Sequence, residues 1–161
     1  GRKAPVYIQS FEVRNLMDLR AKSDLPLIQL MDSEGGPPDM PETSYAVMAT
    51  PSGLTRIASY ADGIGPNKAM VIPRGALGSL AEPTSLVRDA HAAGLKVHPW
   101  TFRRENYFLP LGDKGGVNPA GHGDLGAEIA AYLRTGIDGL FSDNPREAVA
   151  AVAGKSERSS R

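Results

Sequence analysis

The feature that most constrains the fold is a repeated unit, in which a short apolar run is followed by a polar loop and an amphipathic segment. Two of the amphipathic segments end in a glycine followed by an apolar residue, at Gly94-Leu95 and Gly136-Ile137. Glycine readily adopts the left-handed conformation that ends many helices, and the apolar residue after it packs back onto the helix. Strands that alternate with helices in this way predict an α/β fold with a parallel sheet and right-handed crossovers.

Five runs rich in β-branched, aliphatic or aromatic residues are the expected strands. They cover residues 6–11, 25–31, 64–66, 97–102 and 140–142. Between the second and third runs, residues 32–53 are rich in Gly, Pro, Ser and Asp and are expected to form a long loop on one rim of the sheet. The polar residues 155–161 are expected to be a disordered tail, which leaves residues 1–154 as one structural unit.

Helices are expected where apolar residues recur at helical spacing behind a residue that favours a first turn. The residues expected at or near these helix starts are Asn15, Thr84 or Ser85, Asp124 and Pro145. A further short helix is predicted from the shared face of Leu54, Ile57 and Ala61.

Composition excludes several classes of function. The 18 basic residues balance the 18 acidic ones, which argues against a nucleic-acid-binding surface. There is no cysteine, so disulfides, thiolate metal sites and a cysteine nucleophile are excluded. No apolar run approaches the length of about 18 residues that a membrane span needs. The chain opens on Gly1-Arg2-Lys3 rather than on Met, and we therefore expect an internal fragment of a longer protein.

Parallel sheets carry their chemistry at the carboxyl ends of the strands. Trp100, the only tryptophan, falls near the end of the fourth expected strand, with Arg103 three residues later. An aromatic face beside a guanidinium suits a small phosphorylated ligand, although a core tryptophan beside a surface arginine is an equally good interpretation. Asp32 and Glu34 follow the second strand and could form part of a metal site, but acidic residues that open such a loop are more often turn formers.

The three histidines have no spacing that predicts a metal site. His91 is expected on the surface of a helix and His98 in a structural position within a strand, while His122 lies in a Gly-rich loop. We expect none of the three to act in catalysis.

Four segments resemble the glycerophosphodiester phosphodiesterase family, and in particular its periplasmic or secreted bacterial members. The residues that carry the resemblance are Tyr-Ile-Gln-Ser-Phe at 7–11, Tyr-Ala-Asp-Gly-Ile-Gly-Pro at 60–66, the stretch that begins Val-His-Pro-Trp-Thr-Phe-Arg at 97–110, and Gly-Ile-Asp-Gly-Leu-Phe-Ser-Asp-Asn-Pro at 136–145. The family fold is a TIM (β/α)₈ barrel. The order of the segments implies that this chain supplies the C-terminal five strand–helix units, strands 4–8. Its 161 residues are fewer than the roughly 250 of a whole barrel.

The resemblance implies a metal-dependent enzyme that hydrolyses glycerophosphodiesters to glycerol 3-phosphate and an alcohol. In the family, the acid/base histidines and the carboxylates that hold Ca²⁺ or Mg²⁺ come from the first three strands, where an His-Arg-Gly motif occurs. No such motif is present here, so we expect this chain alone to be inactive. It would supply the substrate-side wall. The candidate substrate-binding residues are Gln9, Phe11, Trp100 and Arg103.

Two other functions stay open. The chain could be a non-catalytic half-barrel that acts as an interaction or structural unit, because an open sheet edge favours pairing with another chain. It could also be a sugar- or phosphate-binding barrel of another family. For the phosphodiesterase we expect the missing N-terminal barrel segment, or a symmetry-related chain, as the partner. The resemblance implies a periplasmic or secreted location.

Overall fold

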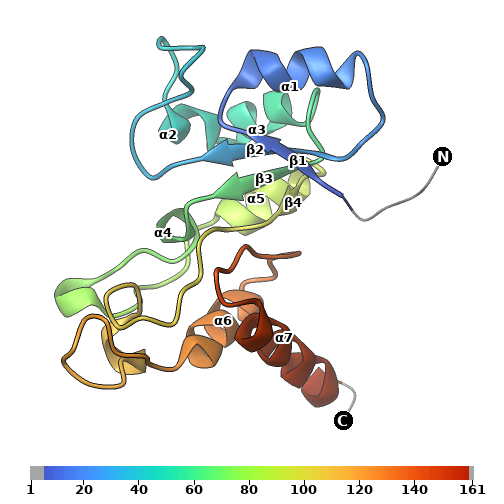
Figure 1. Cartoon of the computed structure of the whole chain (residues 1–161). Helices are drawn as coiled ribbons and strands as arrows, with labels where there is room; N and C mark the ends of the chain where they lie inside the picture. The colour runs from blue at the N-terminus through green and yellow to red at the C-terminus, as the bar shows by residue number, and fades with distance from the viewer. Residues whose placement is uncertain (1–5, 160–161) are drawn as a thin grey trace.

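The structure, a computed structural model, describes the backbone of residues 6–159 and the side chains of residues 6–154. Strands and helices alternate along most of the chain (Figure 1). In chain order the elements are β1 (Ile8–Ser10), α1 (Val13–Arg20), β2 (Leu27–Met31), α2 (Tyr45–Met48), α3 (Pro51–Ile57), β3 (Gly63–Pro66), α4 (Lys68–Val71), a 3₁₀ turn (Ala76–Gly78), α5 (Leu86–Ala92), β4 (Lys96–Val97), a second 3₁₀ turn (Leu111–Asp113), α6 (Leu125–Arg134) and α7 (Pro145–Ser159). The alternation predicted from the sequence is confirmed.

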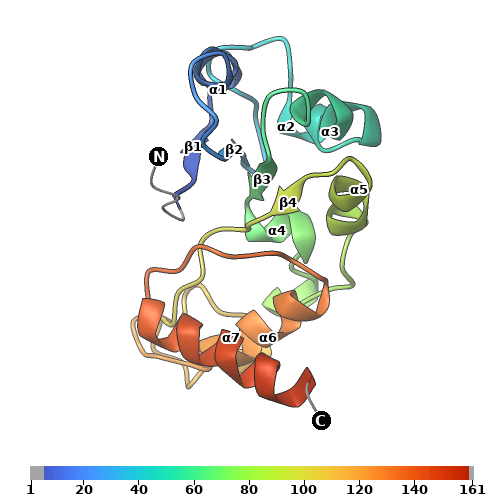
Figure 2. The same ribbon diagram turned by 90° about the vertical axis from the view of Figure 1, so that its right-hand side faces the viewer.

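The four strands form one parallel sheet in the order β1-β2-β3-β4. Sequential neighbours joined by helical crossovers are the arrangement of part of a (β/α)₈ barrel. Helices α1, α3 and α5 cover one face of the sheet, while α6 and α7 lie side by side below it (Figures 1 and 2). The side chains that point from the strands toward the covering helices are fully buried, as Leu27, Met31, Ile64 and Val97 show.

The opposite face of the sheet is buried at Ile28 of β2 but open at β1. On β1 it carries Gln9, which is exposed, and Tyr7 lies on the same face with 38% of its surface exposed. Two glycines of β3, Gly63 and Gly65, leave no side chain on this face where neighbouring atoms come close. A Cβ at Gly65 would lie 2.6 Å from a Leu30 methyl carbon, and one at Gly63 would lie 2.7 Å from a backbone oxygen of the neighbouring strand. We call this surface the inner face, because it corresponds to the interior of a barrel.

Two expected strands are shorter than the sequence suggested, because proline interrupts the hydrogen-bonding ladder. The strand expected at 6–11 is β1, whose first amide, that of Ile8, donates to the carbonyl oxygen of Pro26 at 2.9 Å. Pro26 has no N–H group to donate, and the strand expected at 25–31 begins after it as β2. The short strand expected at 64–66 is confirmed as β3.

The end of the sheet differs most from expectation, since residues 6–159 form four strands rather than five. The strand expected at 97–102 shrinks to Lys96–Val97, because Pro99 cannot donate to the ladder. Residues 140–142 run alongside it without forming a strand. They are held by the Phe141 amide on the Pro99 oxygen at 3.0 Å and by a single parallel bridge between Phe102 and Ser142.

The helix starts were predicted well except for the first. Asp124 accepts a hydrogen bond from the Ala127 amide and begins α6, Pro145 opens α7, and Ser85 stands immediately before α5. The cap expected at Asn15 is wrong, because α1 begins two residues earlier at Val13 and Asn15 lies inside it. Asp39 caps this helix instead.

The loop and tail boundaries also move. Part of the long loop expected at 32–53 is helical, because Ser44 and Thr50 cap α2 and α3. Ala61 lies beyond the end of α3, although it is buried as expected. Helix α7 runs to Ser159, so it overlaps the tail predicted as disordered at 155–161, and residues 160–161 lie outside the described residues. In residues 6–159 no helix is both long and apolar enough to cross a membrane.

Candidate functional site

The ends of β3 and β4 meet at the rim of the sheet where catalysis occurs in parallel α/β proteins. The chain leaves β3 through Asn67 and Lys68, and backbone hydrogen bonds join this turn to the segment after β4. The Lys68 amide donates to the Trp100 oxygen at 2.9 Å, and the Trp100 amide donates to the Pro66 oxygen at 3.1 Å. Two segments distant in the sequence are therefore held side by side.

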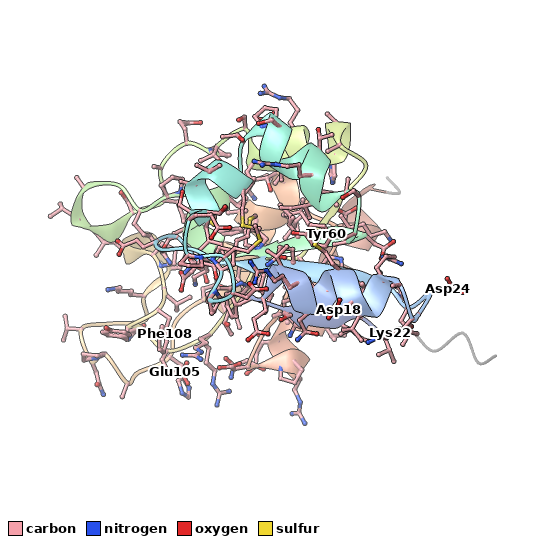
Figure 3. The ribbon with its side chains drawn as sticks, turned by 90° about the horizontal axis from the view of Figure 1, so that it is seen from above. Asp18, Lys22, Asp24, Tyr60, Glu105 and Phe108 are labelled. Atoms are coloured by element: carbon pink, nitrogen blue, oxygen red, sulfur yellow. The ribbon has the colours of Figure 1, made fainter. Side chains whose placement is uncertain are left out.

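A pocket of about 240 Å³ opens between these segments. We call it the rim pocket, and its lining residues are Asn67, Lys68, Trp100, Thr101, Arg103 and Phe108. Phe108 belongs to the long loop after β4. Seen from above, this loop lies on the other side of the molecule from Asp18 and Lys22 of α1 (Figure 3). The rim pocket contains two of the four residues expected to bind substrate, Trp100 and Arg103.

The side chain of Trp100 makes a hydrogen bond and a ring contact. Its indole Nε1 donates to the Gly65 oxygen at 2.7 Å, and the Phe11 ring is nearly perpendicular to it at 5.8 Å between centroids. Phe11 also contacts Tyr45 of α2. Edge-to-face contacts of this kind fix ring orientation. Phe11 therefore lies beside Trp100 but does not line the rim pocket, and its expected role in substrate binding stays a prediction.

Arg103 is fixed on two sides. Its Nε donates to an Asp143 oxygen at 2.5 Å, and its guanidinium lies 4.6 Å from the centroid of the Phe108 ring. Both contacts leave the terminal nitrogens of the guanidinium without a hydrogen-bond acceptor among the described residues. A guanidinium has five N–H donors, so most of them remain available to a ligand.

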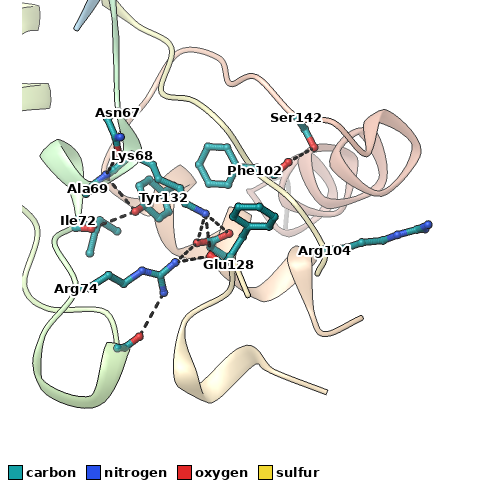
Figure 4. A network of polar contacts seen from close by, with 12 residues as sticks. Asn67, Lys68, Ala69, Ile72, Arg74, Phe102, Arg104, Glu128, Tyr132 and Ser142 are labelled. Atoms are coloured by element: carbon teal, nitrogen blue, oxygen red, sulfur yellow. Dashed lines mark hydrogen bonds and ion pairs between the residues drawn. The ribbon is translucent and has the colours of Figure 1, made fainter. Parts of the chain in front are cut away.

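Behind the rim pocket lies a buried ion network (Figure 4). Glu128 of α6, which is fully buried, accepts hydrogen bonds from Lys68 Nζ at 2.8 and 3.1 Å and from Arg74 at 2.8 Å. Both cations also donate to the Phe108 oxygen, at 3.2 Å from Lys68 and 2.9 Å from Arg74. The network therefore ties the turn after β3 and the loop after β4 to the same helix.

Burial dominates the electrostatics of this network. It raises the pKa of Glu128 and lowers the pKa of Lys68, because each charged form loses hydration, while the attraction between the two opposes both shifts. Tyr132 stands beside the network and donates its hydroxyl proton to the oxygens of Lys68 and Ile72, both at 3.1 Å. Burial raises the pKa of Tyr132 far above its usual range, so it acts as a hydrogen-bond donor.

Glu128, Lys68 and Arg74 were not predicted as site residues from the sequence. Glu128 had a readable signal, because it stands among Leu125, Ile129 and Tyr132 on the stripe of α6 that faces inward. An acidic residue on an apolar stripe is rarely buried without a partner. Gln9, in contrast, is exposed on the inner face and lines no part of the rim pocket.

The histidines and acidic residues have other contacts. His91 lies 2.9 Å from an Asp138 oxygen, so it is paired as well as exposed. His98 is buried on the inner face between the rings of Tyr7 and Phe141. Asp32 accepts hydrogen bonds from Asn67 Nδ2 and from the Ser33 amide and side chain, as a turn former does.

Two other groups mentioned in the sequence analysis, Glu34 and His122, are exposed. Among the described residues no three His, Asp or Glu side chains gather in a way that could hold a metal ion. The donor set for a divalent cation is therefore not found in the part of the chain that the structure describes.

Comparison with known proteins identifies the family that this chain resembles. Residues 1–147 match the model of the glycerophosphoryl diester phosphodiesterase family. The glycerophosphodiester phosphodiesterase GDPD6 of Arabidopsis thaliana is 34% identical over 142 residues, which cover 88% of this chain and 36% of the plant protein. These matches point to the same family as the resemblance of the four sequence segments.

Two solved structures share the fold. A protein from Silicibacter pomeroyi, described as an inferred glycerophosphoryl diester phosphodiesterase, superimposes with a TM-score of 0.59 and 22% identity over 93% of this chain and 38% of its own. One from Agrobacterium tumefaciens with the same description gives 0.51 and 17%, over 95% and 44%. The chain spans less than half the length of each of these relatives. On the match of the family model and of the plant relative, this chain belongs to the glycerophosphoryl diester phosphodiesterase family.

Proposed function

We propose that this chain is the substrate-side wall of a metal-dependent phosphodiesterase that hydrolyses glycerophosphodiesters to glycerol 3-phosphate and an alcohol. The observation that carries the proposal is the rim pocket, which places an aromatic face and an incompletely bonded guanidinium at the carboxyl ends of parallel strands in a member of this family. In this assignment β1 to β4 and the segment 140–142 are strands 4–8 of a (β/α)₈ barrel.

The roles follow from the chemistry of the side chains. Trp100 and Phe11 offer apolar surface to the glycerol carbons. The guanidinium of Arg103 donates hydrogen bonds to phosphate or hydroxyl oxygens. Gln9, exposed on the inner face, is proposed to bond a substrate hydroxyl once the face is covered. Ser142 and Asp143 border the same rim, and Asp143 holds Arg103 in place.

The acid/base and metal-binding groups are proposed to come from residues outside this sequence. The 161 residues contain no His-Arg-Gly motif, and the described residues contain no cluster of potential metal ligands. A bound Ca²⁺ or Mg²⁺ would neutralise charge that develops on the phosphoryl oxygens. The residues of this chain would position the substrate, exclude water from its apolar part and hold the Arg103 donors toward substrate oxygens.

Reconstitution tests the proposal. The chain is mixed with the part of a family relative that carries its first three strands, and release of glycerol 3-phosphate from a glycerophosphodiester is measured with Ca²⁺ or Mg²⁺ present. We expect turnover only from the mixture. Trp100→Phe should lower kcat/KM about tenfold. The control Tyr107→Phe alters an exposed ring of the same loop outside the rim pocket and should have no effect. An inactive mixture that is nonetheless folded and assembled would contradict the proposal.

A second candidate function, a non-catalytic half-barrel that binds another chain, is favoured by the inner face. Tyr7 on this face is 38% exposed, and its neighbour Val6 is 48% exposed. Among the described residues, β1 pairs with another strand on one side only. Sedimentation of the chain alone measures this tendency to associate. Self-association that the three-strand segment fails to displace would favour the second candidate. A monodisperse and cooperatively folding monomer would contradict both, because an open sheet of this kind needs cover.

The location is also a proposal. The motif at 97–110 resembles periplasmic or secreted bacterial members of the family, and we infer such a location for the whole protein. Fractionation of cells that express the complete gene tests it, and retention in the cytoplasm would contradict it.

A further inference from the structure

The charged side chains that line the rim pocket are all cationic. Of the six described residues that line the pocket, two are cationic, Lys68 and Arg103, and none is acidic. The others contribute an amide, a hydroxyl and two aromatic rings. A ligand in this pocket therefore meets hydrogen-bond donors carried on positive charge, and a cationic ligand would meet no carboxylate.

The carboxylates nearest to the pocket are already engaged. Glu128 accepts from both Lys68 and Arg74. Asp143 holds the Nε of Arg103, and Asp32 lies behind Asn67, whose Nδ2 donates to it at 2.9 Å. Each acid thus faces a donor of the pocket wall rather than the pocket itself.

The available donors belong chiefly to Arg103. All three hydrogen bonds from Lys68 Nζ are made to Glu128 and to the Phe108 oxygen. Lys68 therefore contributes positive electrostatic potential to the pocket rather than hydrogen bonds to a ligand. Arg103 uses only Nε, and its terminal nitrogens have no acceptor among the described residues. The guanidinium rests on Phe108 with its centre 4.6 Å from the ring centroid, which leaves the nitrogen edge free to form a bidentate pair with an oxyanion.

An aromatic pocket could also suit a quaternary ammonium group, through cation–π contacts. Here Phe108 already has a cation over its ring, and Trp100 is in perpendicular ring contact with Phe11. A second cation near Arg103 and Lys68 would be repelled by both. The contacts therefore favour an anion over a cation in this pocket.

We propose that the rim pocket is an oxyanion subsite that receives a phosphate or carboxylate group carried by the alcohol part of the substrate, with Arg103 as its principal ligand. The inference rests on the proposed function and deepens it. It assigns the enzyme a preference for glycerophosphodiesters with an acidic or phosphorylated alcohol, and a low preference for those whose alcohol is choline or ethanolamine.

Binding to the chain itself is the first test, because Trp100 is the only tryptophan and lines the pocket. Inorganic phosphate and choline chloride are titrated at constant ionic strength while tryptophan fluorescence is recorded. We expect a saturable change with phosphate and none with choline. Arg103→Gln should weaken phosphate binding about tenfold, which corresponds to one lost charge-assisted contact.

A neighbouring arginine provides the matched control. Arg104 pairs with Glu147 of α7 at 2.7 Å and does not line the pocket, so Arg104→Gln should leave phosphate binding unchanged. Arg103→Lys retains the charge without the planar fork and should bind phosphate with intermediate strength. Circular dichroism confirms that each variant is folded. Saturable choline binding, no phosphate binding, or equal weakening by both glutamine variants would each overturn the subsite.

The reconstituted enzyme separates the subsite from the proposed function. The ratio of kcat/KM for a diester whose alcohol bears a phosphate to that for glycerophosphocholine should exceed one, and Arg103→Gln should reduce it about tenfold. An equal loss for both substrates would place Arg103 on the scissile phosphate and overturn the alcohol assignment. Turnover with a ratio that favours choline would overturn the subsite alone. Failure to hydrolyse either diester, with phosphate still bound at Trp100, would overturn the proposed function alone.

Discussion

Helix α1 should depend on Asp39, a residue of the loop that follows β2. Its two carboxylate oxygens accept hydrogen bonds from the Val13 amide at 3.0 Å and from the Arg14 amide at 2.6 Å. These amides belong to the first turn of α1 and have no acceptor within the helix. Asp39→Ala removes both acceptors, together with a negative charge at the positive end of the helix dipole.

The magnitude follows from the two bonds and the charge. A capping oxygen contributes about 1 kcal/mol, and a carboxylate beside a helix N-terminus adds about 0.5 kcal/mol. The second charge-assisted bond brings the sum to about 2 kcal/mol at a half-buried position. We therefore expect Asp39→Ala to lower the free energy of local opening of α1 by about 2 kcal/mol. Asp39→Asn keeps one acceptor and should cost about 1 kcal/mol.

Amide hydrogen exchange of peptides that cover Val13–Arg20 measures this opening whatever the oligomeric state of the chain. A cost of about 2 kcal/mol corresponds to roughly thirtyfold faster exchange. The matched control is Asn15→Ala, since Asn15 is exposed inside the helix and alanine is the better helix former there. Faster exchange in Asn15→Ala with none in Asp39→Ala would refute the capping by Asp39 and restore the cap expected from the sequence.

Other predictions concern activity, metal binding and stability. The purified chain alone should release no glycerol 3-phosphate from glycerophosphocholine, and chelator-sensitive turnover by it would place catalytic groups within these 161 residues. Calorimetry with Ca²⁺ or Mg²⁺ should show no micromolar site, whereas a single site lost in Asp32→Asn would contradict the turn-forming role of that residue. Burial lowers the pKa of His98, so the unfolded chain takes up a proton more readily than the folded one. The free energy of unfolding of the chain assembled with the three-strand segment should therefore fall as the pH decreases through about 6.5, and His98→Phe should lose part of this slope in urea titrations; an identical slope would contradict it. Tyr132→Phe removes a buried hydroxyl that donates to two backbone oxygens and should lower the urea-derived free energy of unfolding of the chain assembled with the three-strand segment by about 1 kcal/mol; an unchanged value would contradict these two hydrogen bonds.

The sequence predicted what depends on local chemistry. The caps at Asp124 and Pro145 and the positive φ angles of Gly94 and Gly136, +81° and +93°, are set within one turn of the chain and were read correctly. The cap of α1 could not be read in this way. It comes from Asp39, which lies 26 residues from Val13 and reaches it only after the chain has folded back.

The same distinction holds at the site. Trp100 and Arg103 were predicted as candidates because they stand at or just after the end of an expected strand, and the structure places both in the rim pocket, where substrate binding stays a prediction. Phe108 and Lys68 were missed, because their place depends on Glu128, which is 60 residues from Lys68 in the sequence. Local patterns contain no information on such pairs. The shorter β4 was also readable in part, since Pro99 stood inside the expected strand.

The buried network holds the rim pocket together with residues of this chain alone, whereas the inner face has no such network among the described residues. Glu128, Lys68 and Arg74 all belong to this chain, and they bind the two segments that form the pocket to α6. Breaking such a network by removal of one partner is costly, because an unpaired charge is left inside. The rim pocket can therefore keep its geometry when the inner face is uncovered, whereas the surroundings of Gln9 depend on whatever covers that face. Under the proposed function, this chain alone supplies the Arg103 site that binds the substrate oxyanion. Catalysis requires in addition the strands that complete the barrel.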